Sequence, residues 1–276
     1  MTHADAFLQA ILDAPDDDAP RLLFADWLED NGDSDRAELI RVQIALADRP
    51  ADHAVAGLRS RQNALLALHD EEWSESVRAV AFGWEYSRGF VETVEAEAET
   101  FLDGAETLFG RAPVRRVRLH WPPWLRFTSS VVPRLADCPS LARLTTLDLS
   151  GNFLGSDGLQ SLLASPWLTH LTALDLRECR ISDRGVRALA QWPFLTWLTR
   201  LDLSHNEIGP PGVRLLARSL EVRATGGDAP RLRSLPLHGN PLGEAGRRAV
   251  HSSPLLIRVA ELPPADRPFS RAPKRY

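Results

Sequence analysis

The sequence predicts an α/β fold in which short strands and helices alternate along a stacked array of repeats, a solenoid. Two consecutive segments superpose when one is shifted by 27 residues: LTTLDLSGNFLGSDGLQSLLASPWLTH begins at Leu144, and LTALDLRECRISDRGVRALAQWPFLTW follows from Leu171. A third copy begins at Leu198. A fixed period of this kind is typical of repeat architectures, because each repeat buries its apolar face only against its neighbours.

Each repeat opens on a strand and a turn. Leu147 and Leu149 alternate with Asp148 and Ser150, a period of two that gives a strand one buried and one exposed face. A polar residue follows at the turn, where its side chain is expected to satisfy backbone groups that no strand pairing reaches. The four equivalent positions are Asn152, Cys179, Asn206 and Asn240.

A helix completes the repeat. Leu159 and Leu162 have helical spacing, and Val186 with Leu189 is the matching pair in the next copy. Pro166 and its counterpart in the second copy are expected to end these helices, because proline cannot continue the backbone hydrogen bonding. One unit is therefore a strand, a turn and an outer helix.

These residues resemble leucine-rich repeats of the ribonuclease-inhibitor-like type, whose pattern LxxLDLSxNxLGxxGxxxL is present at residues 144–162. A fourth copy, LRSLPLHGNPLGEAGRRAV, begins at Leu232. The resemblance implies parallel strands inside the solenoid and helices outside. Seven residues are inserted before the fourth copy, around EVRATGGDAP, and the glycines and proline there predict a surface loop.

The N-terminal residues 4–48 predict three short helices. Asp18 and Pro20 open the second, Asn31 and Gly32 end it, and Asp35 with Glu38 forms a capping-box pattern for the third. The segment AFLQAILDAPDDDAPRLLFADWLEDNGDSDRAELIRVQIAL resembles the repeat-companion domain that precedes leucine-rich repeats in a family of bacterial proteins. That resemblance implies an architecture and no activity.

The sequence therefore divides into a helical repeat-companion domain, a solenoid and a tail. The helical domain is predicted over residues 1–80, with a further long helix in 52–80. The solenoid is predicted over 81–262, with degenerate opening repeats at 81–143 and regular repeats at 144–252. Within the opening repeats, strands are expected near Phe90 and at 114–119, and a helix at 101–109. Residues 263–276 form a tail rich in proline and arginine.

Several functional classes lack the residues that they need. The sequence has no apolar run of 18 residues, no basic segment of a secretory signal and only two cysteines, so we expect a cytoplasmic protein that does not cross a membrane. It has no HExxH, GxSxG, P-loop, GxGxxG or paired CxxC motif. We therefore expect no enzyme activity, no cofactor and no metal site.

Charge is divided unevenly along the chain. Residues 1–110 carry 24 acidic and 8 basic side chains, whereas residues 111–276 carry 13 acidic and 24 basic ones. Three interpretations are open. The two parts attract each other, the basic part binds an acidic partner, or the acidic part binds a basic partner.

Exposed strand positions of successive repeats stack about 4.8 Å apart, which predicts two columns on the concave face. The first column contains Arg118, Asp148, Asp175, Asp202 and Pro236, and the second contains His120, Ser150, Arg177, Ser204 and His238. A row of carboxylates is suited to the basic side chains of a protein partner. The alternative is that the aspartate is a repeat residue that is solvated or paired with Arg177 and Arg200.

The predicted partner-binding residues of the concave face are Arg118, His120, Asp148, Asp175, Arg177, Arg200, Asp202 and His238. Trp121 and Trp124 stand at the opening of the solenoid and are predicted aromatic anchors, since tryptophan is enriched at binding hot spots. Core or edge packing is the alternative for these two rings.

A third column is predicted on the convex side, where Arg187, Arg214 and Arg248 each follow a repeat glycine by two positions. These arginines suit a nucleic acid or another polyanion, and a solvated helix face is the alternative. The sequence thus predicts a non-enzymatic scaffold for protein–protein interaction, with a regulatory or inhibitory role suggested by family analogy alone. Polyanion binding and a hydrolase or transferase built on the concave carboxylates are the rival hypotheses. A monomer is favoured, and the partner is not identified.

Overall fold

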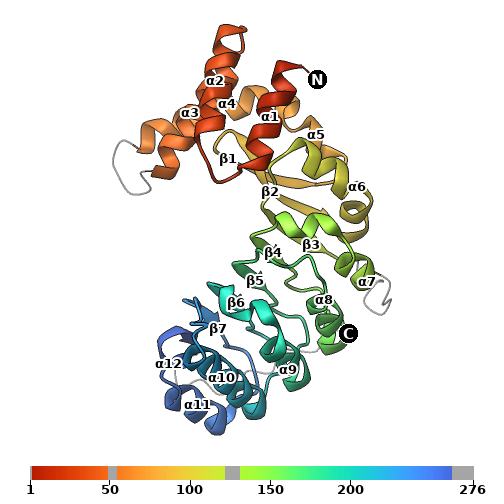
Figure 1. The fold of residues 1–276 in the computed structure, drawn as a ribbon, viewed down its shortest axis with the longest axis vertical. Helices are drawn as coiled ribbons and strands as arrows, with labels where there is room; N and C mark the ends of the chain where they lie inside the picture. The colour runs from red at the N-terminus through yellow and green to blue at the C-terminus, as the bar shows by residue number, and fades with distance from the viewer. Residues whose placement is uncertain (1, 49–54, 122–130, 263–276) are drawn as a thin grey trace. The chain divides into compact units, whose positions relative to one another are not determined.

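The computed structural model describes residues 2–48, 55–121 and 131–262, which form two compact units (Figure 1). The first unit comprises residues 1–121 and 138–144, and the second comprises 122–137 and 145–276. The domain boundary predicted at residue 80 falls inside the first unit and stays a prediction. Trp124 and the predicted tail at 263–276 lie outside the described residues.

The N-terminal part of the first unit is helical. Its helices are α1 (His3–Asp13), α2 (Ala19–Asp30), α3 (Ser34–Asp48), α4 (Val55–Trp73) and α5 (Glu75–Arg78). Helix α2 ends at Asn31, followed by Gly32 at φ +91°, a left-handed conformation that favours glycine. The predicted capping box of α3 is wrong: Asp33, not Asp35, accepts the backbone N–H of Arg36, at 3.1 Å. Asp35 and Glu38 instead form ion pairs with Arg61.

A small sheet follows in the same unit, made of β1 (Gly83–Ser87), β2 (Phe90–Glu97) and β3 (Arg116–His120), with α6 (Ala98–Arg111) between the last two. Strand β1 pairs antiparallel with β2, and β2 pairs parallel with β3. Strands β2 and β3 and helix α6 confirm the elements expected there, whereas β1 was not predicted. A tight turn joins β1 to β2, with Arg88 at φ +50° and Gly89 at φ +87°.

The core of the first unit lies between α1, α2, α3 and β2. It is built from Ile11, Ala25, Leu28, Ala37, Ile40, Ile44 and Phe90. Gly89 approaches Ile40 so closely that a Cβ would lie 2.2 Å from its side chain, which explains why glycine occupies this turn. A buried ion pair at 2.8 Å joins Arg21 of α2 to Glu92 of β2 and ties the helices to the sheet.

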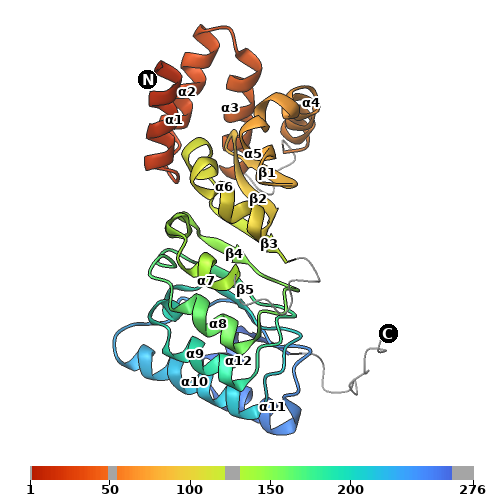
Figure 2. The ribbon, with the colours of Figure 1, turned by 90° about the vertical axis from the view of Figure 1, so that its right-hand side faces the viewer.

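The second unit repeats strand and helix. Its elements are α7 (Val131–Ala136), β4 (Thr146–Asp148), α8 (Gly155–Leu163), β5 (Ala173–Asp175), α9 (Asp183–Gln191), β6 (Arg200–Asp202), α10 (Pro210–Thr225), β7 (Leu235–Pro236), α11 (Gly243–Ser252), α12 (Leu256–Val259) and β8 (Ala260–Glu261). Strands β4, β5 and β6 form a parallel sheet in that order, and β7 pairs parallel with β8. Figure 2 shows helices α8, α9, α10 and α11 stacked beside one another. Leu147, Leu174 and Leu201 fill the interior between strands and helices.

The insertion before the fourth copy forms the predicted loop only in its second half, because residues 221–225 are helical and the exposed turn begins at Gly226. Helix α10 has 16 residues whereas α9 has 9, and the two helices begin at equivalent positions, so the seven inserted residues lengthen α10 at its C-terminal end. Gly226 and Gly227 end the helix, and a turn follows. The residues EVRAT before these glycines carry no helix-breaking residue, so they continue the helix.

A ladder of buried side chains holds the turns of neighbouring repeats. The Nδ2 atom of Asn206 donates to the carbonyls of Leu176, Leu203 and Ser204, and its Oδ1 atom accepts the N–H groups of Cys179 and Ile181. Asn240 bonds in the same way to Leu203, Leu237 and Ile208, and Asn152 donates to Leu149. The expectation that these residues satisfy backbone groups is confirmed.

Candidate functional site

The strand face of the second unit carries a column of three carboxylates. Asp148 lies opposite Asp175 across β4 and β5, and Asp175 lies opposite Asp202 across β5 and β6. The strands are parallel and in register, so the 27-residue period places the same repeat position side by side. We call Asp148, Asp175 and Asp202 the carboxylate column.

Each carboxylate of the column has a local structural role. The Oδ1 atoms accept the N–H groups two residues ahead: Ser150 at 2.8 Å, Arg177 at 2.9 Å and Ser204 at 2.9 Å. Asp202 also accepts the Ser204 hydroxyl and pairs with Arg200 at 3.0 Å through Oδ2. These bonds stabilise the turn after each strand. The aspartate is therefore a repeat residue as well as a candidate binding residue.

Asp175 differs from its neighbours because it is the centre of the column and lies between two other carboxylates. Burial raises the pKa of its carboxyl, the hydrogen bond from Arg177 lowers it, and the charges of Asp148 and Asp202 raise it further. Among the residues that the structure describes, its second oxygen accepts no hydrogen bond. A partly buried carboxylate between two others is a strong acceptor for an added cationic group.

The neighbouring column does not neutralise the carboxylates. Arg177 is exposed and pairs with Glu178 at 2.9 Å, not with the aspartates. His238 packs edge-on against His205, with ring centroids 5.0 Å apart. Of the two arginines considered as internal partners, only Arg200 pairs with the column.

Arg118, His120 and Trp121 belong to the first unit, whereas the carboxylate column belongs to the second. Arg118 and His120 both contact Glu95 of β2, at 3.8 and 2.5 Å. Trp121 is half-buried. The sequence analysis missed Glu95, although its position opposite Arg118 follows once β2 and β3 are placed in register.

The three arginines predicted on the outer helices, Arg187, Arg214 and Arg248, are exposed. Arg248 pairs with Glu244 of its own helix at 3.1 Å. Within residues 2–48, 55–121 and 131–262, Arg187 and Arg214 have no ion-pair partner. These two cations remain candidates for binding a polyanion.

Two further features bear on the classes of function. No cluster of three or more metal-ligating side chains occurs in the described parts of the chain. None of the helices described there is both long enough and apolar enough to span a bilayer.

Comparison with known proteins identifies the repeats. The family model described as Leucine Rich repeat matches residues 143–163, 168–190 and 194–217, which contain the whole carboxylate column. No curated protein matched the chain. Leucine-rich repeats commonly mediate protein–protein interaction, on surfaces formed by stacked strands. Three consecutive segments of the chain, almost entirely within the second unit, therefore match leucine-rich repeats.

Proposed function

We propose that the second unit is a non-enzymatic interaction module that binds a protein partner on its strand face through the carboxylate column. The partner supplies arginine or lysine side chains to Asp175 and its two neighbours. The role is regulatory or inhibitory toward that partner, and the site of action is the cytoplasm. The helices of the first unit act as a repeat-companion domain of the kind found in bacterial proteins.

The observation that carries the proposal is the carboxylate of Asp175, whose second oxygen accepts no hydrogen bond from the described residues. A carboxylate that is partly buried between two like charges raises the free energy of the unbound protein, and a cationic partner removes that cost. The column is also rigid, because each Oδ1 atom is already bonded to the backbone. Binding to a preformed surface loses little conformational entropy.

Polyanion binding is the second candidate, and it is favoured by Arg187 and Arg214, which are exposed and form no ion pair with any described residue. They occupy equivalent positions on α9 and α10, so their spacing repeats with the array. Such binding would weaken steeply with added salt, because each arginine that meets a phosphate releases a counterion.

The test compares two charge-neutralised variants that keep the fold. In the first, Asp148, Asp175 and Asp202 become asparagine, whose Oδ1 atom still accepts the backbone N–H bond. In the second, Arg187, Arg214 and Arg248 become glutamine. The intact chain and both variants are used to capture proteins from native lysate, with and without nuclease, and captured proteins are quantified by mass spectrometry.

We expect a captured protein that is lost with the asparagine variant and kept with the glutamine variant, whatever the nuclease treatment. The purified partner should then bind the asparagine variant about tenfold or more weakly, a change of about 1.4 kcal/mol. Capture that is unaffected by the asparagine changes would overturn the proposal. Nuclease-sensitive capture that is lost with the glutamine variant would assign the function to the helix face.

A further inference from the structure

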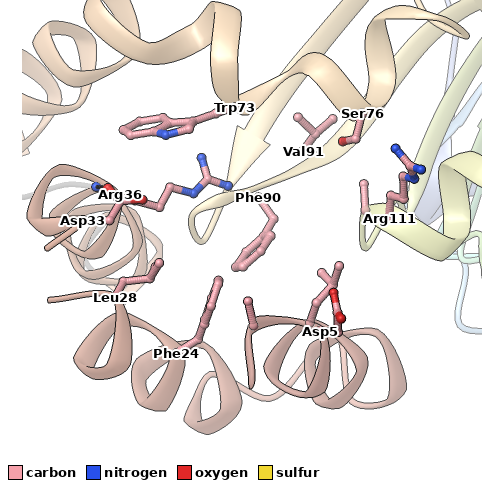
Figure 3. A pocket seen from close by; sticks show the side chains of 13 residues that line it. Asp5, Phe24, Leu28, Asp33, Arg36, Trp73, Ser76, Phe90, Val91 and Arg111 are labelled. Atoms are coloured by element: carbon pink, nitrogen blue, oxygen red, sulfur yellow. Dashed lines mark hydrogen bonds between the residues drawn. The ribbon is translucent and has the colours of Figure 1, made fainter. Parts of the chain in front are cut away.

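The first unit contains a cavity of about 270 Å³ that opens between its helices and strand β2 (Figure 3). Its apolar walls come from Leu8 of α1, Phe24 and Leu28 of α2, Trp73 of α4, and Phe90 and Val91 of β2. Small-molecule sites are concave and mostly apolar, with a few polar groups that fix the ligand. The lining of this cavity has that character.

The charged side chain of Arg36 lies between two aromatic rings of the cavity. Figure 3 shows Arg36 extending from α3 between Trp73 and Phe90, and its guanidinium carbon lies 4.7 Å and 5.3 Å from the two ring centroids. Its Nη1 atom is buried and, among the described residues, has no hydrogen-bond partner. A buried donor without an acceptor is costly, and such atoms are rare in folded proteins.

Burial lowers the pKa of Arg36 to about 10, and the charges of Tyr86, Asp33 and Glu72 oppose that change. The side chain therefore remains protonated near neutral pH. It forms no ion pair within the described parts of the chain. The cavity is thus lined by a positively charged guanidinium, and one of its N–H donors has no acceptor among the described residues.

The acidic residues of the lining are engaged elsewhere. Asp33 accepts the backbone N–H of Arg36 at 3.1 Å, as the cap of α3. The carboxylate of Asp5 accepts the backbone N–H of Thr2 at 2.6 Å, and the backbone N–H of Asp5 donates to the Thr2 hydroxyl at 3.2 Å, which forms the capping box of α1. Arg111, an exposed residue at the end of α6, lies across the cavity from Arg36 and has no ion-pair partner in the described residues (Figure 3).

We propose that this cavity, the Arg36 pocket, binds a small organic molecule that carries one carboxylate on an aromatic or aliphatic body. The carboxylate accepts from the guanidinium of Arg36, and the apolar body packs against Phe24, Phe90 and Trp73. Arginine is well suited to carboxylates because its planar fork donates two parallel hydrogen bonds. Asp5 and Asp33 repel a doubly charged phosphate more strongly than a singly charged carboxylate, so a monocarboxylate fits this lining best.

The competing explanation is that Arg36 only packs against aromatic rings. Cation–π contacts occur in many proteins without any ligand. Under that explanation the cavity binds organic anions no better than their neutral analogues, and removing the charge of Arg36 changes no binding. The two explanations therefore differ in a direct binding measurement.

The experiment titrates the full chain with phenylacetate and with 4-methylpentanoate, followed by calorimetry and by protein NMR. Phenylacetamide is the neutral analogue, and inorganic phosphate is the control anion. We expect a carboxylate to bind with a Kd of about 1 mM or below, at least about tenfold more tightly than the amide or phosphate. The indole N–H resonance of Trp73, assigned with Trp73→Phe, should shift during the titration.

Arg36→Met removes the charge and keeps an unbranched apolar stem, and it should weaken carboxylate binding at least about tenfold. Arg184→Met, at an exposed position of the second unit, is the matched control and should bind as the intact chain does. No carboxylate binding at about 10 mM would overturn the proposal. Equal binding of amide and carboxylate, or binding that leaves the Trp73 resonance unshifted, would also overturn it, and both are measured on the intact chain.

Discussion

The asparagine ladder of the second unit and the Arg36 pocket of the first both bury polar groups, but they satisfy them differently. In the ladder, Asn206 makes five hydrogen bonds that join two repeats. In the pocket, the Nη1 atom of Arg36 makes none among the described residues. Asn206 thus stabilises the fold through its hydrogen bonds, whereas Arg36 has a donor that the fold does not use. Substitutions at the two kinds of site should therefore differ in how much they lower the free energy of unfolding.

The largest loss of stability is expected for Asn206→Ala. The change leaves three carbonyls and two N–H groups in a buried turn without their partner, so the free energy of unfolding should fall by about 4 kcal/mol. Urea denaturation followed by circular dichroism measures this. Asn31→Ala is the control, because the exposed side chain of Asn31 makes one hydrogen bond, to Trp27, and should cost less than about 1 kcal/mol. A similar cost for both variants would contradict a structural role of the ladder.

The next largest loss is expected for Glu92→Gln in the first unit. Glu92 is buried and pairs with Arg21 at 2.8 Å and with Arg88 at 3.0 Å. Removing its charge leaves a buried guanidinium without its counter-ion, which should cost about 3 kcal/mol. Glu106→Gln, at an exposed position of α6, should be neutral in the same denaturation experiment. A neutral Glu92→Gln would show that the pair does not hold the helices on the sheet.

Arg36→Met sharpens the comparison with Arg21, the other arginine that contacts Phe90. Without ligand, the loss of cation–π contacts and the removal of an unsatisfied buried donor oppose each other. The free energy of unfolding should therefore change by less than about 1 kcal/mol, whereas Arg21→Met, which removes the fully buried partner of Glu92, should cost about 3 kcal/mol. Both are measured in urea. If Arg36→Met and Arg21→Met lowered the free energy of unfolding equally, Arg36 would have a structural role like that of Arg21.

The smallest effect is expected for Asp175→Asn, and it depends on pH. Burial and two neighbouring carboxylates raise the pKa of Asp175 above its ordinary value, so the folded protein binds this proton more tightly than the unfolded chain does. The charged carboxylate therefore destabilises the fold above the raised pKa, and this cost disappears as pH falls to the unfolded value near 3.8. The substitution should stabilise the protein by less than about 1 kcal/mol at pH 7 and have no effect below about pH 3.8. Thermal unfolding at a series of pH values measures this difference, and a variant less stable at pH 7 would contradict the assigned shift.

The repeats and the carboxylate column could be predicted from the sequence because both follow from one period. Once Leu147 and Leu174 are equivalent, the register places Asp148 beside Asp175 without further information. Strand β1 was not predicted, because the alternation of Trp84 and Tyr86 with polar residues spans only a few positions, and all five residues of GWEYS remain at least partly accessible. The lengthening of α10 was missed because Gly226 and Gly227 suggested a loop, whereas the preceding residues simply continue the helix.

The Arg36 pocket could not be predicted from the sequence for a different reason. Its lining comes from α1, α2, α3, α4, α5, β2 and the end of α6, which are spread along the chain and follow no common period. The sequence suggested a capping box at Asp35 and Glu38 and gave no indication that Arg36, which follows Asp35, would line a cavity. The burial of one nitrogen atom depends on how helices pack, and that information is not local.

Cys179 occupies the ladder position of the second repeat, and its thiol can report how often that repeat opens. Cys179 donates to the carbonyl of Leu149 from inside the stack, and burial raises the pKa of its thiol to about 12. Alkylation requires a thiolate that the reagent can reach, so Cys179 reacts only when the second repeat opens. In a Cys138→Ser background, which removes the other thiol, the alkylation rate would report how often the array frays. A partner that binds across neighbouring strands would lower the alkylation rate of Cys179, even if the partner contacts other residues of the strand face.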